Sequence, residues 1–317
     1  MELVAGVDVG GTKLLAALVD PSGKVRHRLV LATDPNAATA SILAALDQLL
    51  AAHAGHAGEV LAIGVGVAGF VEYHSGRVAF APNLTYEEPE VAKVVRARFN
   101  LPVTVENDAG AAAWGEHEFG AGRGCDEMLL VTVGTGIGGG IVVGGRLYRG
   151  HGGFAAEVGH MTLLEAGPSC ACGQRGCLEA LASGTAIGRM GREGVKAAPD
   201  SVLLELAGGD PARITGALVT QAARSGDRLA ASVVERAGRW LGAGLASLVN
   251  ILDPELVVVG GGAVGAGGLL MEPARAELAS RLSGRREPPP VEEASLGNEA
   301  GAIGAAALAR ELVAAGG

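Results

Sequence analysis

The sequence predicts an α/β fold that occurs twice along the chain, as two lobes with a ligand-binding cleft between them. A short apolar run, a glycine-rich turn and a second apolar run occupy Leu3 to Val19, and the same pattern returns at Met128 to Val143, about 124 residues later. Short runs of this kind alternate with segments of helical spacing, as they do in α/β proteins. Glycines number 52 among 317 residues, and aromatic residues make up only 3%. The core must therefore be built from Val, Leu, Ile and Ala, with glycine in tight turns between strands.

The charge balance excludes several classes of protein. There are 34 acidic residues against 25 Lys and Arg, a formal net charge of −9, which argues against general affinity for nucleic acid or for an anionic membrane. With 49% hydrophobic and 19% charged residues, the chain is not disordered. The first residues lack the basic segment of a secretory signal. We therefore expect a cytoplasmic protein that binds neither nucleic acid nor membrane.

One uncharged run, Met128 to Gly145, reaches the length of a membrane span. Seven of its 18 residues are glycine, with a group of them in the middle of the run. A strand, a glycine turn and a second strand explain this composition better than a transmembrane helix does.

The N-terminal part is predicted to be a hairpin followed by alternating strands and helices. A strong turn signal at Asp20 to Gly23 ends the hairpin. In chain order the predicted elements are strands at Leu3–Val9, Leu14–Val19 and Val25–Ala32, a helix at Ala37–His53, a buried strand at Val60–Val67, a helix at Pro89–Phe99 and a strand at Val103–Glu106.

The remaining part opens with the second hairpin and is mostly helical beyond Leu178. Its predicted elements are strands at Met128–Val133 and Ile141–Val143, helices at Ile214–Ala223 and Leu229–Ile251, a buried strand at Leu256–Val259, a charged, proline-rich loop at Arg285–Pro290 and a helix at Ala300–Ala314. We expect a small N-terminal lobe of residues 1–106, joined by the C-terminal helix 300–317, and a large lobe of residues 107–299.

The first glycine turn, Asp8 to Lys13, is a candidate phosphate site. Glycine lets the backbone approach a phosphate closely, and successive N–H groups in such a turn form an anion-binding nest. Asp8, at the strand end, could reach a Mg²⁺ ion. A plain hairpin turn is the alternative, but the second turn at Gly134 to Gly140 favours a nucleotide, because two such turns can clamp one. Neither turn has the Walker A pattern or the Rossmann fingerprint.

Polar residues follow the predicted strand at Val103 to Val105. Side chains at the carboxyl end of a strand project into the cleft of an α/β fold. Asp108 could accept a proton from a substrate hydroxyl there, and Asn107 could hydrogen-bond another hydroxyl. The alternative is that Asp108 caps a helix beginning at Ala109. Both roles can coexist.

The strongest local signal is a set of one histidine and three cysteines: His160, Cys170, Cys172 and Cys177. Three thiolates and one imidazole are typical of closed tetrahedral zinc sites. No spare ligand is evident, so the zinc is expected to be structural; three free thiols are the alternative. Zinc would also position Glu157 and Glu179 near the metal. Such carboxylates suit the vicinal hydroxyls of a sugar, although a surface charge is the usual fate of glutamate.

These motifs together resemble the ROK family of bacterial sugar kinases and repressors, over most of the chain. Within that family the chain is most similar to actinobacterial ATP-dependent glucokinases. The segments that carry the resemblance are Asp8–Lys13 with Asp20 behind it, Val133–Gly140, Glu157–His160, Cys170–Glu179, Gly260–Gly262, Val67–Val71 and Ala81–Leu84. One departure is Ala156, which stands where many members have glycine.

The resemblance implies an actin-like, ribonuclease-H-like fold and a role for each matched residue. Asp108 would be the catalytic base, and a structural Zn²⁺ would be held by His160, Cys170, Cys172 and Cys177. The implied sugar contacts are Gly69, Asn83, Asn107, Asp108, Glu157, His160 and Glu179. The implied contacts to ATP with Mg²⁺ are Asp8, Gly10, Gly11, Thr12, Lys13, Thr135, Gly136, Gly261 and Gly262.

The expected activity is transfer of the ATP γ-phosphate to the 6-hydroxyl of glucose. A kinase for another hexose, such as N-acetylglucosamine, N-acetylmannosamine or fructose, is the alternative, because the family shares most sugar contacts. A sugar-responsive repressor is less expected, since such members carry a DNA-binding helix-turn-helix before the first motif and Asp8 lies only seven residues from the start. We expect a homo-oligomer, either a dimer or a tetramer.

Overall fold

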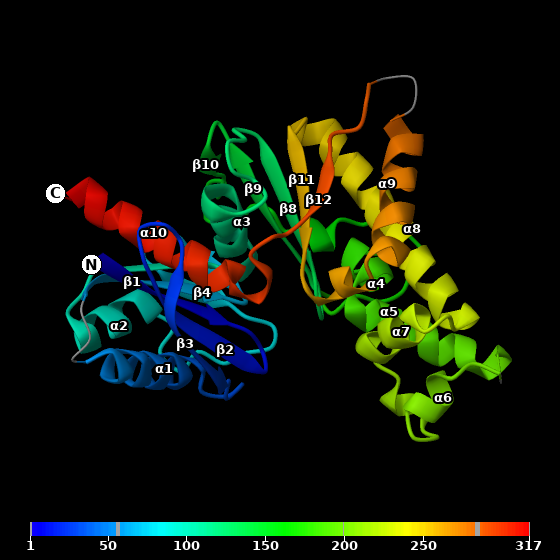
Figure 1. Ribbon diagram of the computed structural model, residues 1–317, viewed down its shortest axis with the longest axis horizontal. Helices are drawn as coiled ribbons and strands as arrows, with labels where there is room; N and C mark the ends of the chain where they lie inside the picture. Colours follow the sequence, from blue (N-terminus) through cyan, green and yellow to red (C-terminus); the bar gives the residue numbers. More distant parts are fainter. Residues whose placement is uncertain (1, 55–57, 199, 283–285, 317) are drawn as a thin grey trace. The chain divides into compact units, whose positions relative to one another are not determined.

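The structure is a computed structural model that describes residues 2–54, 58–198, 200–282 and 286–316. The chain divides into two compact units (Figure 1). The first unit comprises Met1–Leu130, Gly140–Ala156 and Ala294–Gly317, and the second comprises Val131–Gly139 and Glu157–Glu293.

The first unit is built on a five-stranded sheet in the order β3-β2-β1-β4-β7. The predicted hairpin is confirmed, since β1 and β2 are antiparallel, as are β2 and β3. Strands β1, β4 and β7 run parallel, so their carboxyl ends share one edge. The strands are β1 (Glu2–Val9), β2 (Lys13–Val19), β3 (Val25–Ala32), β4 (Glu59–Val67) and β7 (Val103–Asn107).

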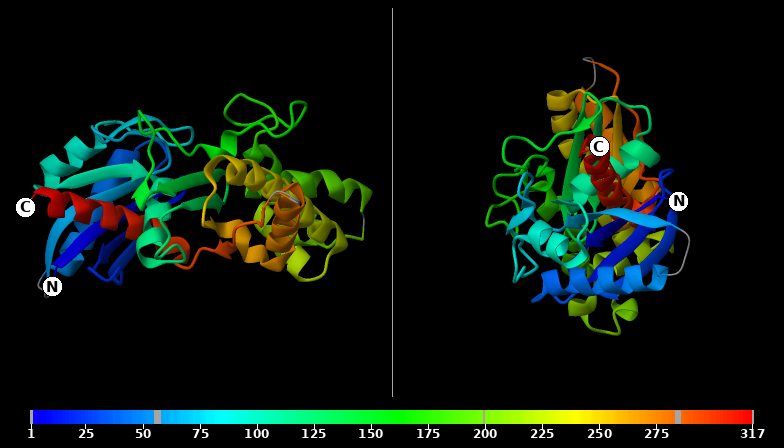
Figure 2. Two further views of the ribbon diagram at one scale, coloured as in Figure 1. Left: turned by 90° about the horizontal axis from the view of Figure 1, so that it is seen from above. Right: turned by 90° about the vertical axis from the view of Figure 1, so that its left-hand side faces the viewer.

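Helices cover both faces of this sheet (Figure 2). Helices α1 (Ala38–His53) and α2 (Val91–Phe99) pack on one face and enclose the larger apolar core. Helix α10 (Ala300–Gly316) lies along the other face. Its backbone comes so close that a Cβ on Gly6 of β1 or Gly64 of β4 would collide with a carbonyl oxygen of α10. Glycine at these strand positions therefore allows the helix to dock.

Helix α3 (Asp108–Phe119) is held to α10 and to the segment before it. The fully buried carboxylate of Glu116 accepts hydrogen bonds from the backbone of Ala121, Ser295 and Leu296, at 2.8–3.1 Å, and from the Ser295 hydroxyl. A buried charge is tolerated only when it is satisfied in this way. This packing is why residues 107–130 join the first unit, whereas the sequence predicted a boundary after residue 106.

The second sheet repeats the topology of the first, in the order β10-β9-β8-β11-β12. In each sheet the first strand, β1 or β8, has the next two strands of the chain on one side and two later strands on the other. This shared arrangement confirms the predicted duplicated α/β fold. The chain passes between the units within β8 and β9. The strands are β8 (Met128–Val133), β9 (Ile137–Val143), β10 (Arg146–Leu147), β11 (Leu256–Gly260) and β12 (Val291–Glu293).

Strand β9 begins at Ile137, four residues before the predicted start, so the second turn is shorter than expected. Three of the glycines assigned to the turn lie within the strand. At Gly140 the reason is packing, because a Cβ there would collide with Ala113 of α3. The uncharged run that includes this turn is two strands, as predicted, and no helix within the described part of the chain is long and apolar enough to cross a membrane.

The second unit is mostly helical, as predicted beyond Leu178. Helix α8 packs closely against α9. A Cβ on Gly238 of α8 would lie 2.4 Å from the carbonyl oxygen of Leu270 in α9, so this packing requires glycine at position 238. The helices are α4 (Leu178–Ala182), α5 (Gly184–Gly194), α6 (Leu203–Leu206), α7 (Gly216–Arg224), α8 (Arg228–Leu252) and α9 (Gly268–Leu282).

The smaller elements include a two-stranded sheet that the sequence did not predict. It pairs β5 (Phe70–Glu72) with β6 (Arg77–Phe80) in the first unit. The single-turn helices are η1 (Val158–His160), η2 (Val195–Ala197), η3 (Pro211–Arg213), η4 (Gly262–Ala266) and η5 (Gly297–Glu299). The predicted loop at Arg285–Pro290 lies partly outside the described residues, since Arg285 is not described.

Candidate functional site

The junction between β7 and α3 places Asn107 and Asp108 at the shared carboxyl edge of the parallel strands. The cap of α3 is Asn107, whose Oδ1 accepts from the N–H groups of Ala109 at 2.9 Å and Gly110 at 3.0 Å. The alternative role of Asp108 as the N-cap is therefore wrong. Asp108 is the first residue of the helix, and its Oδ1 accepts from the Ala109 N–H at 2.9 Å. The amide serves as the cap, so the carboxylate is not needed for it.

Glu106 holds this junction in place through two hydrogen bonds. It is buried, its Oε1 accepts from the backbone N–H of Asn107 at 3.0 Å, and its Oε2 accepts from Nε of Arg149 at 2.5 Å. The Arg149 guanidinium also lies 4.2 Å from the ring centroid of Tyr73, a cation–π contact. Sequence reasoning missed Arg149, because no local pattern links residues 43 positions apart.

Two carboxylates of the first unit, Asp8 and Asp108, have raised pKa values. Burial raises the pKa of Asp108 to about 6. Burial also raises the pKa of Asp8 to about 7, with a further rise from the charge of Asp108 and an opposing effect from Lys13. Asp8 is backed by the start of α10, where a Cβ on Gly301 would lie 2.6 Å from its carboxyl carbon. Two half-buried carboxylates whose pKa values are raised form a setting suited to a divalent cation.

The first glycine turn lies between β1 and β2 at the same edge. The N–H of Gly10 donates to the carbonyl of Lys13 at 3.0 Å, and the carbonyl of Thr12 accepts from Thr33 at 3.1 Å. Gly11 is exposed, and a Cβ on it would meet no atom within 4 Å. The fold itself therefore does not require glycine at position 11.

The two remaining sugar-contact candidates of the first unit differ in their surroundings. The carbonyl of Gly69 accepts from Nδ2 of Asn107 at 3.1 Å, which joins it to the junction. Asn83 is exposed in the loop after β6, and within the described part of the chain no hydrogen bond links it to Asn107 or Asp108. The structure thus groups Gly69 with the junction by direct contact, but not Asn83.

The second unit brings together the other nucleotide-contact candidates. Thr135 and Gly136 follow β8, and Gly261 and Gly262 follow β11, the neighbouring strand. Gly261 has a φ of 88°, and a Cβ on it would lie 2.6 Å from the carbonyl oxygen of Val133. Residues of two separate motifs therefore meet at one edge of this sheet.

The predicted metal ligands also lie together in the second unit. One ligand atom each from His160, Cys170, Cys172 and Cys177 falls within 4.8 Å of all the others. Sγ of Cys170 is 3.7 Å from Nδ1 of His160, and Sγ of Cys172 is 3.7 Å from Sγ of Cys177. Sulfur ligands of a tetrahedral zinc at ~2.3 Å would lie about 3.8 Å apart. The donor set and its spacing therefore fit zinc.

The three thiols are coupled to one another. Burial is the largest cause that raises the pKa of Cys170 to about 12, and hydrogen bonds with the other two thiols add to it. Burial also raises the pKa of Cys177. The pKa of Cys172 is lowered instead, because hydrogen bonds from the Gln174 backbone and from the other two thiols outweigh the effect of burial. A metal ion binds cysteine as the thiolate, so zinc binding would release the protons that the thiols hold.

Glu179 connects the cysteine cluster to the second glycine turn. Its Oε2 accepts from the N–H of Ile137 at 2.9 Å, and a Cβ on Gly136 would collide with the same oxygen. Its Oε1 lies 3.7 Å from Sγ of Cys170. Sequence reasoning placed Glu179 near the metal but missed its contact with the turn, 42 residues away.

His160 and Glu157 are neighbours on and before η1, as their spacing predicts. Nε2 of His160, the nitrogen opposite the thiols, is 3.9 Å from Oε2 of Glu157. Both side chains are about one-third exposed. The histidine therefore presents one nitrogen to the cluster and the other to a carboxylate.

Ala156, which precedes Glu157, has a left-handed backbone with a φ of 69°. An L-residue with a Cβ is strained there by about 1–2 kcal/mol. Ala156→Gly is therefore expected to raise the free energy of unfolding by about 1 kcal/mol, after the entropy cost of glycine is subtracted. Urea denaturation followed by circular dichroism measures it. Ala155→Gly, at a position without positive φ, is the control and should destabilise; a loss of stability in Ala156→Gly would contradict the strain.

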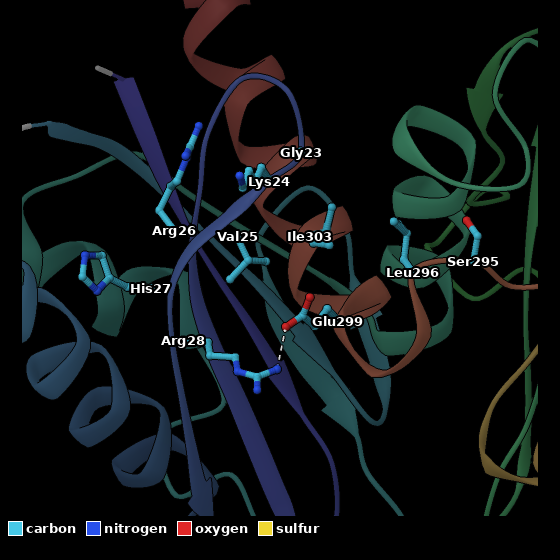
Figure 3. Close-up of a pocket in the computed structure, with 10 residues that line it drawn as sticks. All are labelled: Gly23, Lys24, Val25, Arg26, His27, Arg28, Ser295, Leu296, Glu299 and Ile303. Atoms are coloured by element: carbon cyan, nitrogen blue, oxygen red, sulfur yellow. Dashed lines mark hydrogen bonds and ion pairs between the residues drawn. The ribbon is translucent and has the colours of Figure 1, made fainter.

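A separate cavity of about 580 Å³ lies between β3 and the start of α10 in the first unit (Figure 3). Arg28 at its wall pairs with Glu299 at 3.0 Å, and Arg26 pairs with the buried Asp20. The buried Asp20 also accepts from Ser22 at 2.8 Å and Lys24 at 3.2 Å, so it organises the turn between β2 and β3. No predicted site residue lines this cavity.

The chain is similar to known proteins along nearly its whole length. The ROK family model matches residues 4–312. The glucokinase of Streptomyces coelicolor is 43% identical over 317 residues, which cover 98% of this chain and 98% of that protein. A crystal structure of a ROK family glucokinase from Streptomyces griseus, in complex with glucose and AMPPNP, is 42% identical with a TM-score of 0.89, covering 98% of this chain and 99% of that one. A ROK hexokinase structure from Thermus thermophilus is 35% identical with a TM-score of 0.79, covering 99% of both chains.

Proposed function

The chain belongs to the ROK family, and from this premise we propose that it is a glucokinase that transfers the γ-phosphate of ATP to the 6-hydroxyl of glucose. Its similarity to glucokinases over nearly the whole chain supports this activity. The observation that carries the mechanism is the β7–α3 junction. There the half-buried carboxylate of Asp108, which has a raised pKa, lies at the same edge of the sheet as the first glycine turn. The carboxylate suits the hydroxyl of an alcohol acceptor, and the turn suits the phosphates of the donor.

Asp108 is the proposed catalytic base. It orients the 6-hydroxyl and takes its proton as the new bond to phosphorus forms, since phosphoryl transfer depends chiefly on positioning and charge stabilisation. Glu106 and Arg149 hold the junction, and Asn107 contributes its amide to Gly69 as well as to the helix cap. The base is therefore positioned by a satisfied network and not by a mobile loop.

The remaining sugar contacts are proposed as Gly69, Asn83, Asn107, Glu157, His160 and Glu179. Carboxylates and amides bind vicinal hydroxyls through their oxygens and N–H groups. The cysteines and Nδ1 of His160 would hold Zn²⁺, which supplies order to the segment that carries Glu179 when it is bound. In the second unit, the carbonyl of Thr135 accepts from the Thr185 hydroxyl at 2.7 Å, which steadies the nucleotide turn.

The nucleotide contacts are proposed as Asp8 and Gly10 to Lys13 in the first unit, with Thr135, Gly136, Gly261 and Gly262 in the second. A magnesium ion bound with ATP neutralises charge on the phosphates. Lys13 adds a positive charge, which opposes the rise in the pKa of Asp8. The net charge of −9 supports the accompanying proposal that nucleic acid is not a partner.

A coupled assay over a panel of hexoses tests the proposed function. Glucose should give the highest kcat/KM with ATP, and polyphosphate in place of ATP tests the donor. A higher kcat/KM for N-acetylglucosamine, N-acetylmannosamine or fructose would replace glucose as the substrate. Phosphorylation of none of these sugars would overturn the kinase assignment.

Gly11→Val is expected to raise the KM for ATP at least ~10-fold. A side chain at this position would push the phosphate away from the backbone N–H groups of the turn. Hydrogen bonds to charged groups contribute about 1.5–3 kcal/mol each, so the loss of one accounts for this factor. The fold should survive, since a Cβ at position 11 meets no atom within 4 Å. Steady-state kinetics measure the KM, with Gly11→Ala as the smaller step in the series. An unchanged KM for ATP in the Val variant, with circular dichroism unchanged, would remove this turn from the nucleotide site.

A further inference from the structure

The loop after β6 is fastened to the start of α1 on both sides of Tyr86. The N–H of Thr85 donates to the carbonyl of Pro35 at 2.7 Å, and the Thr85 carbonyl accepts from Ala38 at 3.0 Å. The carboxylate of Glu87 accepts from two N–H groups in the first turn of α1, at 2.7 and 3.2 Å. This helix has no side-chain cap of its own, so Glu87 serves as one. The backbone at Tyr86 is therefore fixed.

The side chain of Tyr86 combines an apolar contact with an unsatisfied hydroxyl. Its ring packs against the apolar core between the first sheet and α1 and α2. Its Oη is buried and has no hydrogen-bond partner among the residues that the structure describes. Buried hydroxyls are costly when unpaired, and nearly all of them in folded proteins have a partner. Tyr86 is thus held in place with a hydroxyl that donates no hydrogen bond to any described residue.

The hydroxyl lies within electrostatic reach of the proposed catalytic base. Burial raises the pKa of Tyr86 above its ordinary value, and the negative charge of Asp108 raises it further. Tyr86 therefore stays protonated at neutral pH and can donate a hydrogen bond.

The loop also adjoins the proposed sugar contacts. A Cβ on Gly69 would lie 2.7 Å from the carbonyl oxygen of Phe80, so the loop leaves β6 where Gly69 packs against it. The carbonyl of Gly69 in turn accepts from Asn107. Asn83 lies in the same loop, three residues before Tyr86. The contact of Gly69 with the start of this loop, together with the effect of the Asp108 charge on Tyr86, thus associates Tyr86 with the group formed by Gly69, Asn107 and Asp108.

We propose that Tyr86 is a further substrate-binding residue, whose hydroxyl donates a hydrogen bond to a hydroxyl of the bound hexose and so helps to select the sugar. The inference rests on the proposed function, because it takes the ligand to be a hexose. The bonded group is one other than the 6-hydroxyl, since a hydrogen bond donated to the attacking oxygen would lower its nucleophilicity. A site that hydrogen-bonds a substrate hydroxyl discriminates against analogues that lack it.

Sugar binding by the wild type and Tyr86→Phe tests the proposal. Isothermal titration calorimetry without nucleotide measures the affinity for glucose and for its 1-, 2-, 3- and 4-deoxy analogues. Tyr86→Phe should weaken glucose binding about tenfold. One of the deoxy analogues should bind the wild type and the variant equally, because the hydroxyl that Tyr86 contacts is missing from it. Tyr148→Phe, which removes a phenol hydroxyl from a side chain that is 51% exposed, should match the wild type throughout.

Two results would overturn the proposal. One is equal affinity of the wild type and Tyr86→Phe for all five sugars. The other is a loss of the same size for every sugar, which would assign the hydroxyl to an ordered water or to local structure. The coupled assay separates this test from the proposed function: a wild type that binds glucose but does not phosphorylate it refutes the kinase activity, while the analogue series still decides the role of Tyr86.

Discussion

Asp108→Asn is expected to lower kcat by at least ~10²-fold, the usual scale for loss of a general base. The asparagine retains the size of the side chain and much of its hydrogen bonding, but it cannot accept the proton of the 6-hydroxyl. Glucose affinity should change much less, because an amide oxygen can still accept a hydrogen bond. Steady-state kinetics with glucose and ATP separate the two effects, since the loss should fall on kcat and not on the KM for glucose.

The same substitution is expected to stabilise the fold at neutral pH. The pKa of Asp108 is raised from an ordinary value of 3.8 to about 6, chiefly by burial, so the folded state binds the proton more tightly than the unfolded chain does. The ionised carboxylate therefore opposes folding at pH 7, and this penalty fades as the pH falls through 6 toward 4. Asparagine never ionises, and the cap of α3 on Asn107 remains. Urea denaturation should show a higher stability than the wild type at pH 7 and a smaller difference near pH 4.

The pH dependence of wild-type kcat/KM is a third test of the role of Asp108. Protonation of the base should reduce kcat/KM as the pH falls below about 6. Asp47→Asn, at an exposed position that pairs with Arg98, is the matched control and should retain normal kinetics. A near-normal kcat in Asp108→Asn would exclude Asp108 as the base, and Glu157 would be the next residue to test.

Cys172→Ser is expected to abolish zinc binding and to reduce kcat/KM for glucose by ~10-fold or more, since even residues that only support the metal ligands affect activity on that scale. The reason is that Glu179 follows the last cysteine closely and also accepts a hydrogen bond from the N–H of Ile137, the residue directly after the second glycine turn. Disorder of the cysteine loop would therefore disturb a sugar contact and a phosphate contact together. Elemental analysis should find one zinc per chain in the wild type and none in the variant.

Cys125→Ser is the control for this change, because Cys125 is the one cysteine outside the four-ligand cluster. It should keep both zinc and activity. Freshly purified, active wild-type protein without zinc would refute the metal assignment, whatever the kinetics of Cys172→Ser. A Cys172→Ser variant that loses zinc but keeps normal kcat/KM would separate the metal from sugar binding.

Features that depend on near neighbours in the chain were predictable from the sequence. The two hairpins follow from apolar runs around glycine turns, and β3 occupies the predicted Val25–Ala32. The cysteine cluster was predictable for the same reason, since Cys170, Cys172 and Cys177 lie within one short loop whose spacing already limits their separation. In such segments local conformation alone decides which side chains can meet.

Features that join distant parts of the chain were decided only by the tertiary structure. Both Asn107 and Asp108 are suited to cap a helix, and the choice of Asn107 depends on how β7 enters α3. Glu106 meets Arg149 across 43 residues, and Glu116 meets Ser295 across 179. The left-handed backbone of Ala156 is equally invisible in the sequence, because alanine rarely adopts it. A carboxylate can accept a hydrogen bond from any donor that packing brings near. The sequence by itself therefore determined which groups need hydrogen-bond partners. The docking of α3, α10 and the loops determined which partners these groups have.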